Sequence, residues 1–262
     1  MSCLFDIACN FSSERFDDDL LEVIERAKLN NVSKFLIISA SLSDFPKLHQ
    51  IYTNYIEDSF FTIGTHPHHA NEINKDEIQI MREMIKLHNP SCIGETGLDF
   101  FRNLSTYDEQ IYAFEEQIKL SIEFDKPLYL HQRDAHKDFI SLVRKYKNDI
   151  PKAVVHCFTG THKELEDYLE LGFYIGLTGW ICDERRNIEL RESIRSIPLD
   201  KIMVETDSPF LIPRNLKQKP KNNRNEPSFL PHIVNEIATL VGLEKNELTD
   251  ITYKNTIEFL NK

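Results

Sequence analysis

Ile93-Gly94-Glu95-Thr96-Gly97-Leu98-Asp99 joins a short apolar run to a carboxylate, and the same pattern recurs along the chain. A buried strand that ends in a His, Glu or Asp is unusual, and here five apolar runs of strand length do so. The runs are residues 60–64, 91–94, 127–130, 153–155 and 201–204. The polar residues at or just beyond their carboxyl ends are His66, Glu95, His131, His156 and Asp207.

This repetition indicates that the strand ends converge on one site. Two or three imidazoles with two carboxylates are the ligands that divalent metals take in hydrolytic enzymes. The alternative is that each residue is an ordinary capped or hydrogen-bonded loop residue. That alternative explains any one of these residues, but it does not explain why all five stand at the carboxyl ends of apolar runs.

Strand-length apolar runs alternate with helical patterns from one end of the chain to the other. This order predicts an α/β fold, a (β/α)8 TIM barrel, with residues 1–262 as a single domain. A doubly wound open sheet is the alternative, but the chain contains no G-x-G-x-x-G turn and no P-loop. Strands are expected at 4–8, 35–39, 60–65, 92–94, 128–131, 153–156, 173–176 and 201–205. Helices are expected at 17–29, 44–57, 75–87, 106–124, 135–147, 162–171, 187–196, 230–241 and 245–260.

The composition narrows the class of protein. The chain has 262 residues and a formal net charge of −11, which argues against a protein that coats nucleic acid nonspecifically. The N-terminal segment lacks the pattern of a signal peptide, and no apolar run is long enough for a membrane span. The five cysteines show neither zinc-finger nor redox spacing, so we expect free thiols and a cytoplasmic protein. Cys157 follows His156 directly and is expected to face outward, because successive strand residues alternate.

The longest irregular segment, residues 208–228, follows the last expected strand and is rich in Pro, Asn, Lys and Arg. Barrels keep their active sites at this rim, so we interpret the segment as a functional loop, with a floppy surface loop as the alternative. Arg side chains grip phosphate in a bidentate manner, and an aromatic ring can stack on a terminal base. The candidates are Arg133, Arg185, Arg186, Lys217, Lys219, Lys221 and Arg224 for phosphate, and Phe100, Phe101 and Trp180 for a base.

The proposed ligands define a hydrolytic chemistry. Glu95, His131, His156 and Asp207 can hold one divalent cation, or two if Glu95 bridges them. A bound cation lowers the pKa of a coordinated water and offsets charge on a phosphoryl oxygen. Asp207 is placed to accept the proton of that water, and His66 to donate a proton or hold the phosphate. His68 and His69 lie in the same His-rich loop, which is often merely exposed to solvent.

These stretches resemble the TatD family of metal-dependent deoxyribonucleases over essentially the whole chain. The resemblance implies a TIM barrel of the metal-dependent hydrolase superfamily and Mg²⁺-dependent hydrolysis of phosphodiesters, often from the 3′ end of DNA or RNA. Carried over to matching positions, it implies Glu95, His131, His156 and Asp207 as metal ligands. It rests on residues 5–7, 64–68, 93–99, 131–136, 156–160, 174–180, 205–209 and 224–227.

One departure from the family pattern concerns the first strand. Many members carry a His-x-His pair there that binds a second metal, and Ala8 and Asn10 stand at the corresponding positions. The number of cations, one or two per chain, therefore stays open. Mg²⁺ is the first expectation, with Mn²⁺ and Zn²⁺ as alternatives.

The leading hypothesis is a monomeric, cytoplasmic 3′→5′ exonuclease whose partners are the 3′ ends of single-stranded DNA or RNA. A hydrolase of amide, lactone or aminoacyl ester bonds is the second hypothesis, because fold and ligands do not decide the substrate. A non-catalytic binding protein is the third. In the leading hypothesis the catalytic residues are Asp207, His66 and Glu95, and the substrate-binding residues are Arg133, His68, Arg185 and Arg224.

Overall fold

Parallel strands follow one another around the molecule in the order of the sequence. The computed structural model describes residues 3–185, 187–220 and 222–261. Within them an eight-stranded sheet has the order β1 to β8, and every ladder is parallel. The strands are β1 Leu4–Cys9, β2 Val32–Ile37, β3 Ser59–Ile63, β4 Cys92–Asp99, β5 Leu128–Arg133, β6 Ala153–Val155, β7 Tyr174–Leu177 and β8 Ile202–Val204.

The sheet comes close to closing on itself where the last strand meets the first. Cys9 forms a parallel bridge with Ser208, and the Asn10 backbone N–H donates to the Ser208 carbonyl at 2.9 Å. This closure confirms the predicted barrel. It also brings the segment after β8 against the carboxyl end of β1.

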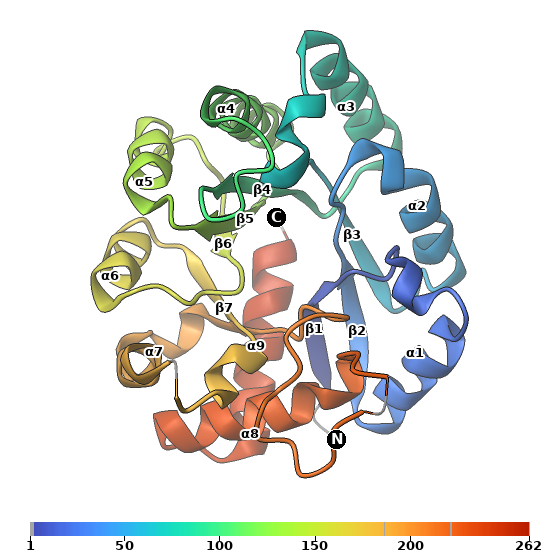
Figure 1. The fold of residues 1–262 in the computed structure, drawn as a ribbon, viewed down its shortest axis with the longest axis vertical. Helices are drawn as coiled ribbons and strands as arrows, with labels where there is room; N and C mark the ends of the chain where they lie inside the picture. Colours follow the sequence, from blue (N-terminus) through green and yellow to red (C-terminus); the bar gives the residue numbers. More distant parts are fainter. Residues whose placement is uncertain (1–2, 186, 221, 262) are drawn as a thin grey trace.

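Helices surround the strands (Figure 1). Their apolar faces pack on the outside of the barrel and form the larger of two hydrophobic clusters. Because βα units place a helix after each parallel strand, the strands are buried on both faces and read as continuous apolar runs. The helices are α1 Leu20–Leu29, α2 Phe45–Asn54, α3 Lys75–His88, α4 Tyr107–Phe124, α5 His136–Lys145, α6 His162–Glu170, α7 Ile188–Ser193, α8 Leu230–Val241 and α9 Lys245–Leu260.

The second hydrophobic cluster fills the barrel interior and is closed by the C-terminal helix. Phe5, Tyr129 and Met203 point inward and pack with Phe259 of α9. The amide of Asn255 donates to the carbonyls of Leu199 and Ile202, where β8 begins, at 2.7 and 2.8 Å. Helix α9 therefore covers the amino ends of the strands, and their carboxyl ends remain open to the functional loops.

Several element boundaries differ from those expected from the sequence. The helix expected at 17–29 begins only at Leu20, because Glu14–Phe16 forms a separate 3-10 turn whose Phe16 is buried. The helix expected at 187–196 spans Ile188–Ser193 and continues as a 3-10 turn. The strand expected at 92–94 extends to Asp99.

The extension of β4 depends on glycine. Gly97 has a φ of 146°, and a Cβ there would lie 1.9 Å from the carbonyl oxygen of His131 on β5. Only a residue without a Cβ allows this close approach of the two strands. Glu95 consequently lies inside β4 and not at its end.

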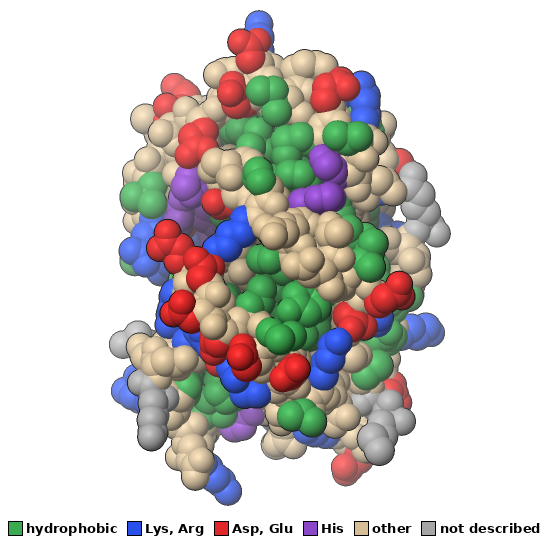
Figure 2. Space-filling view, turned by 90° about the vertical axis from the view of Figure 1, so that its right-hand side faces the viewer, with side chains coloured by type: hydrophobic (Ala, Val, Ile, Leu, Met, Phe, Trp, Pro, Cys, Tyr) green, Lys and Arg blue, Asp and Glu red, His purple; other side chains and the backbone are tan. Residues whose placement is uncertain are grey.

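On the side of the molecule where α1 and α2 lie, basic side chains are scattered among acidic ones (Figure 2). The described side chains on this face therefore form no extended basic patch of the kind that binds nucleic acid nonspecifically. Within the described residues, no helix combines the length and the apolar character needed to cross a bilayer.

Candidate active site

A carboxylate and two imidazoles meet at the carboxyl end of the barrel. Oε1 of Glu95 lies 2.9 Å from Nδ1 of His131 and 2.7 Å from Nε2 of His156, and these two nitrogens are 3.4 Å apart. Strands β4 and β5 supply Glu95 and His131, while His156 directly follows β6. A cation whose ligands stand at about 2.1 Å holds neighbouring ligand atoms about 3 Å apart, so this set fits a divalent metal.

The second nitrogen of each imidazole faces a further buried carboxylate. Nε2 of His131 is 3.5 Å from Asp99, and Nδ1 of His156 is 3.6 Å from Glu205. Neither nitrogen has a hydrogen-bond partner within the described residues. Histidines that bind metals usually direct their second N–H at a carboxylate, so Asp99 and Glu205 strengthen the fit.

Sequence reasoning gave Asp99 and Glu205 no role, although both stand in the motifs quoted above. The available signal was a second acid near the end of the same strand, four residues after Glu95 and two before Asp207. Glu205 also accepts hydrogen bonds from the Tyr129 hydroxyl at 3.0 Å and the Cys157 N–H at 2.5 Å.

His66 lies beside this cluster with a defined tautomer. Its Nε2 is 3.3 Å from Oε1 of Glu95, and its Nδ1 accepts the backbone N–H of His68 at 3.1 Å. A backbone N–H can only donate, so the proton of the neutral ring sits on Nε2. Burial lowers the pKa of His66 to about 4, with the charge of Glu95 opposing it, so the ring is neutral near pH 7.

His66, Glu95 and His131 also form a group whose potential ligand atoms lie within 4.8 Å of one another. A protonated Nε2 has no lone pair to offer a metal. We therefore interpret His66 as a hydrogen-bond donor beside the cation site, with His131 and His156 as the imidazoles that fit a cation.

Asp207 lines the same cleft and is held by the first strand. The Asn10 amide donates to its Oδ1 at 3.0 Å. Burial raises the pKa of Asp207 to about 7, with His156 lowering it and Glu95 raising it. Asn10 thus orients a carboxylate, while Ala8 is fully buried.

The charges of the cluster depend on one another. Burial alone would raise the pKa of Glu95, but the charge of His156 and the hydrogen bonds from His131 and His156 hold that pKa well below its usual value. Burial alone would lower the pKa of His156, but the charges of Glu95 and Glu205 hold it well above its usual value. An anionic centre that attracts positive charge in this way also suits a cation.

The cleft has a volume of about 550 Å³ and opens around this cluster. Arg133 lines its rim with its guanidinium 3.8 Å from the centre of the Phe101 ring. His68 also lines it and bonds to Asp99 at 2.8 Å, whereas His69 pairs with Glu72 at 2.9 Å. Of the side chains expected to bind substrate, Arg133 and His68 therefore reach the cleft.

Arg224, which was expected to bind substrate, lies outside the lining of the cleft. Its guanidinium donates to both carboxylate oxygens of Asp19 at 2.7 Å and to Glu226 at 2.9 Å. These ion pairs anchor the end of the long loop to the start of α1, and the Arg224 side chain is 7% exposed. In the structure Arg224 is a loop anchor whose guanidinium is engaged by two carboxylates.

Two further expectations also change. Cys157 was expected to face outward but lines the cleft, because its φ of 47° interrupts the strand alternation. Burial raises the pKa of its thiol to about 12, so it offers no thiolate to a metal. Arg185 pairs with Asp183 at 3.3 Å and is not part of the cleft lining. Arg186 and Lys221 lie outside the described residues.

A parallel barrel with histidines and carboxylates gathered at the carboxyl ends of its strands defines a TIM-barrel hydrolase with a candidate metal site. A family model described as TatD-related DNase matches residues 5–261. The chain belongs to this family.

Relatives and solved structures agree with this assignment. The chain is 45% identical over 252 residues to the 3′-5′ ssDNA/RNA exonuclease TatD of Rahnella sp. (strain Y9602), covering 96% of both chains. It resembles the crystal structure of a TatD family hydrolase from Entamoeba histolytica with a TM-score of 0.88 and 27% identity, covering 99% of this chain and 98% of that one. For the TatD homologue YJJV from Escherichia coli K12 the TM-score is 0.90 at 24% identity, with 99% and 98% covered.

Proposed function

We propose that this chain is a metal-dependent exonuclease that removes nucleotides from the 3′ ends of single-stranded DNA or RNA, with residues 1–262 as one monomeric domain. One observation carries the proposal. Oε1 of Glu95, Nδ1 of His131 and Nε2 of His156 lie within 3.4 Å of one another in the cleft. The family assignment and the relatives named 3′-5′ ssDNA/RNA exonuclease supply the reaction and the substrate class.

Glu95, His131, His156 and Asp207 would hold the cation. When bound, it supplies Lewis acidity that lowers the pKa of a coordinated water and offsets charge on a phosphoryl oxygen. We expect Mg²⁺, with Mn²⁺ or Zn²⁺ as alternatives, because carboxylates suit Mg²⁺ and Mn²⁺ while imidazoles suit Zn²⁺. Asn10 and Ala8 provide no imidazole for a second cation, so we expect one cation per chain.

The protein's own groups would handle the proton and the phosphate. Asp207, oriented by Asn10, accepts the proton of the attacking water. His66 donates a hydrogen bond from its Nε2–H to an oxygen of the scissile phosphate and keeps its proton, so the ring stays neutral. Arg133 at the rim pairs with the phosphate bidentately. Asp99 and Glu205 fix the rings of His131 and His156 from behind.

Labelled oligonucleotides test this proposal. With Mg²⁺, Mn²⁺ or Zn²⁺, the wild type is expected to release single nucleotides from the 3′ end and to leave a 5′ label on progressively shorter strands. Glu95→Gln and His156→Ala are expected to lose this activity, and EDTA is expected to abolish it in the wild type. His162→Gln is the matched control, because its half-exposed ring on α6 lies outside the cleft lining and pairs with Glu166 at 3.6 Å.

Two outcomes would overturn the proposal. Full activity in both Glu95→Gln and His156→Ala would exclude the metal site. Hydrolysis of a small ester or amide panel by the wild type, without any release of nucleotides, would assign the cleft to a different bond.

A further inference from the structure

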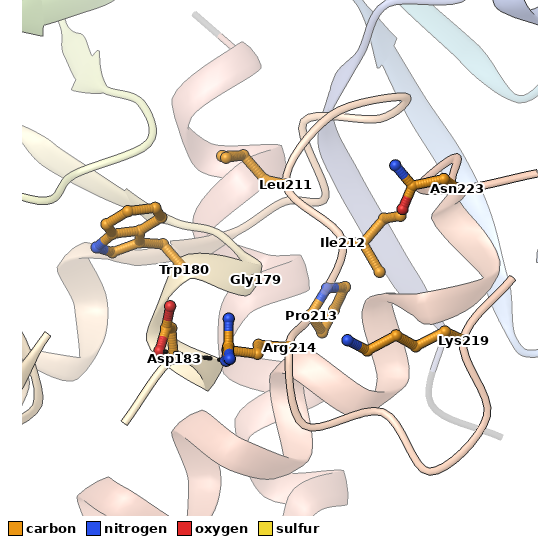
Figure 3. Close-up of a pocket in the computed structure, with 9 residues that line it drawn as sticks. All are labelled: Gly179, Trp180, Asp183, Leu211, Ile212, Pro213, Arg214, Lys219 and Asn223. Atoms are coloured by element: carbon orange, nitrogen blue, oxygen red, sulfur yellow. Dashed lines mark ion pairs between the residues drawn. The ribbon is translucent and has the colours of Figure 1, made fainter. Parts of the chain in front are cut away.

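A second hollow lies beside the active-site cleft. It has a volume of about 230 Å³ and forms between the 3-10 turn Gly179–Cys182 and the long loop after β8 (Figure 3). Trp180 and Leu211 line both this hollow and the cleft, so the two cavities are neighbours. We call it the loop groove; its lining is Gly179, Trp180, Asp183, Leu211, Ile212, Pro213, Arg214, Lys219 and Asn223.

The loop groove is basic in an otherwise acidic protein. Arg214 and Lys219 line it, and Asp183 is the acid of its described lining. Asp183 is 8% exposed and already pairs with Arg185 at 3.3 Å, while Arg214 stands 3.8 Å from it. Among the residues that the structure describes, no hydrogen bond or ion pair engages the Lys219 side chain. The whole chain carries a net charge of −11, so this local excess of positive charge favours an anionic ligand.

The walls of the loop groove are fixed by packing. A Cβ on Gly179 would lie 2.7 Å from the Leu211 carbonyl oxygen and 3.0 Å from the Pro213 ring, so turn and loop are in close contact. Arg15 holds the loop on both sides of the hollow, donating to the carbonyls of Pro209 at 3.1 Å and Asn223 at 2.7 Å. The basic side chains are thus presented by an anchored loop.

An aromatic ring completes the loop groove on the side that faces the cleft. Trp180 stands on one side of the hollow, with Lys219 and Asn223 on the other (Figure 3). A tryptophan between a catalytic cleft and basic side chains offers a base a stacking surface next to phosphate ligands.

A third cavity, which also adjoins Trp180, has the opposite charge. Its described lining has three acidic side chains, Asp134, Glu164 and Glu189. Arg133 is the basic side chain of that lining. A run of phosphates is disfavoured there by charge repulsion. Of the loop groove and this third cavity, the loop groove is therefore the one suited to a polyanionic strand.

We propose that the loop groove binds the strand on the 5′ side of the 3′-terminal nucleotide. Arg214 and Lys219 bind its backbone phosphates, and Trp180 stacks on a base between the groove and the scissile bond. This assignment rests on the proposed exonuclease function. It adds the direction in which the uncleaved strand leaves the active site.

Charge reversal tests the proposal. The substrates are a single strand of about 12 nucleotides and a dinucleotide, which is too short to reach the groove. For the combined Arg214→Glu and Lys219→Glu variant, we expect KM for the long strand to rise about tenfold with unchanged kcat, and a shallower dependence of log KM on log salt. For the dinucleotide, both constants stay within about twofold of the wild type.

Lys217→Glu is the control, because it makes the charge change of one of these two substitutions on the same loop, outside the groove lining. An unchanged KM for the long strand in the double variant overturns the proposal. So does an equal effect of Lys217→Glu, or an equal loss with the dinucleotide.

Binding without hydrolysis separates this inference from the function on which it rests. Fluorescence anisotropy of the labelled long strand in EDTA is expected to show about tenfold weaker binding by the double variant than by the wild type. If the wild type hydrolyses neither substrate with any cation, the exonuclease assignment fails, and this binding difference still decides whether the groove holds a strand. Equal binding of the strand by the two proteins refutes the proposal that the loop groove binds it.

Discussion

Replacing Arg224 by Ala tests whether this side chain anchors the loop or binds phosphate. Its guanidinium donates to the Arg15 carbonyl at 2.5 Å, to Asp19 at 2.7 Å and to Glu226 at 2.9 Å, and it lies 4.9 Å from the centre of the Phe16 ring. Truncation leaves the carboxylate of Glu226, which is 8% exposed, without this cation. Removing one partner of a buried ion pair typically costs about 3–5 kcal/mol.

The lower end of that range applies here, about 3 kcal/mol. Arg26 still contacts both carboxylates in the variant, and Asp19 is 33% exposed, so water offsets part of the loss. For a domain of this size we expect Tm to fall by about 6–12 °C. Circular dichroism during heating and urea titration measures the change. Arg185→Ala is the control, because its side chain is 54% exposed and its ion pair with Asp183 is therefore expected to contribute less than about 1 kcal/mol.

The contrary result is specific. If Arg224→Ala kept Tm within about 1 °C of the wild type and instead raised KM for a long single strand several-fold, Arg224 would bind substrate. The ion pairs with Asp19 and Glu226 would then contribute little to the stability of the loop, and Arg224 would belong to the substrate-binding surface.

Three further predictions concern the carboxylates behind the histidines, the barrel floor and the β4–β5 contact. Asp99→Asn and Glu205→Gln should each weaken Mn²⁺ binding about 10- to 100-fold by calorimetry while the fold is retained; unchanged affinity would mean that these carboxylates do not orient the rings. Phe259→Ala should reduce the free energy of unfolding by about 3–5 kcal/mol, because it leaves a cavity at the closed end of the barrel. The kcat of the folded variant should equal that of the wild type. A lowered kcat would argue against α9 being remote from the active site. Gly97→Ala should displace β4 from His131 and remove metal binding, and a variant that folds and binds Mn²⁺ normally would show that the close approach is dispensable.

The sequence predicts the architecture well, because the barrel depends on patterns that are local. The alternation of apolar runs with amphipathic segments is enough to order the strands, and the bounds of Leu230–Val241 and Lys245–Leu260 match the expectation. Boundaries fail where tertiary contacts override the pattern. Glu95 lies inside a strand because Gly97 lets β4 continue past the point where the apolar run stops.

The charged side chains are harder to predict, because their roles depend on which neighbours the fold supplies. Arg224 and Arg214 look alike in the sequence, yet one is enclosed by Asp19 and Glu226 while the other lines the loop groove. Asp99 and Glu205 acquire their place behind the histidines only when separate strands meet at one rim.

Direct measurement of cation binding tests the central claim that Glu95, His131 and His156 together form a metal site. Titration of metal-free protein with Mn²⁺, followed by the electron paramagnetic resonance signal of the free ion, gives the affinity and the number of sites. We expect about one site per chain in the wild type and at least about tenfold weaker binding in Glu95→Gln, with His162→Gln unchanged. Equal binding of Mn²⁺ by the wild type and Glu95→Gln would contradict the claim.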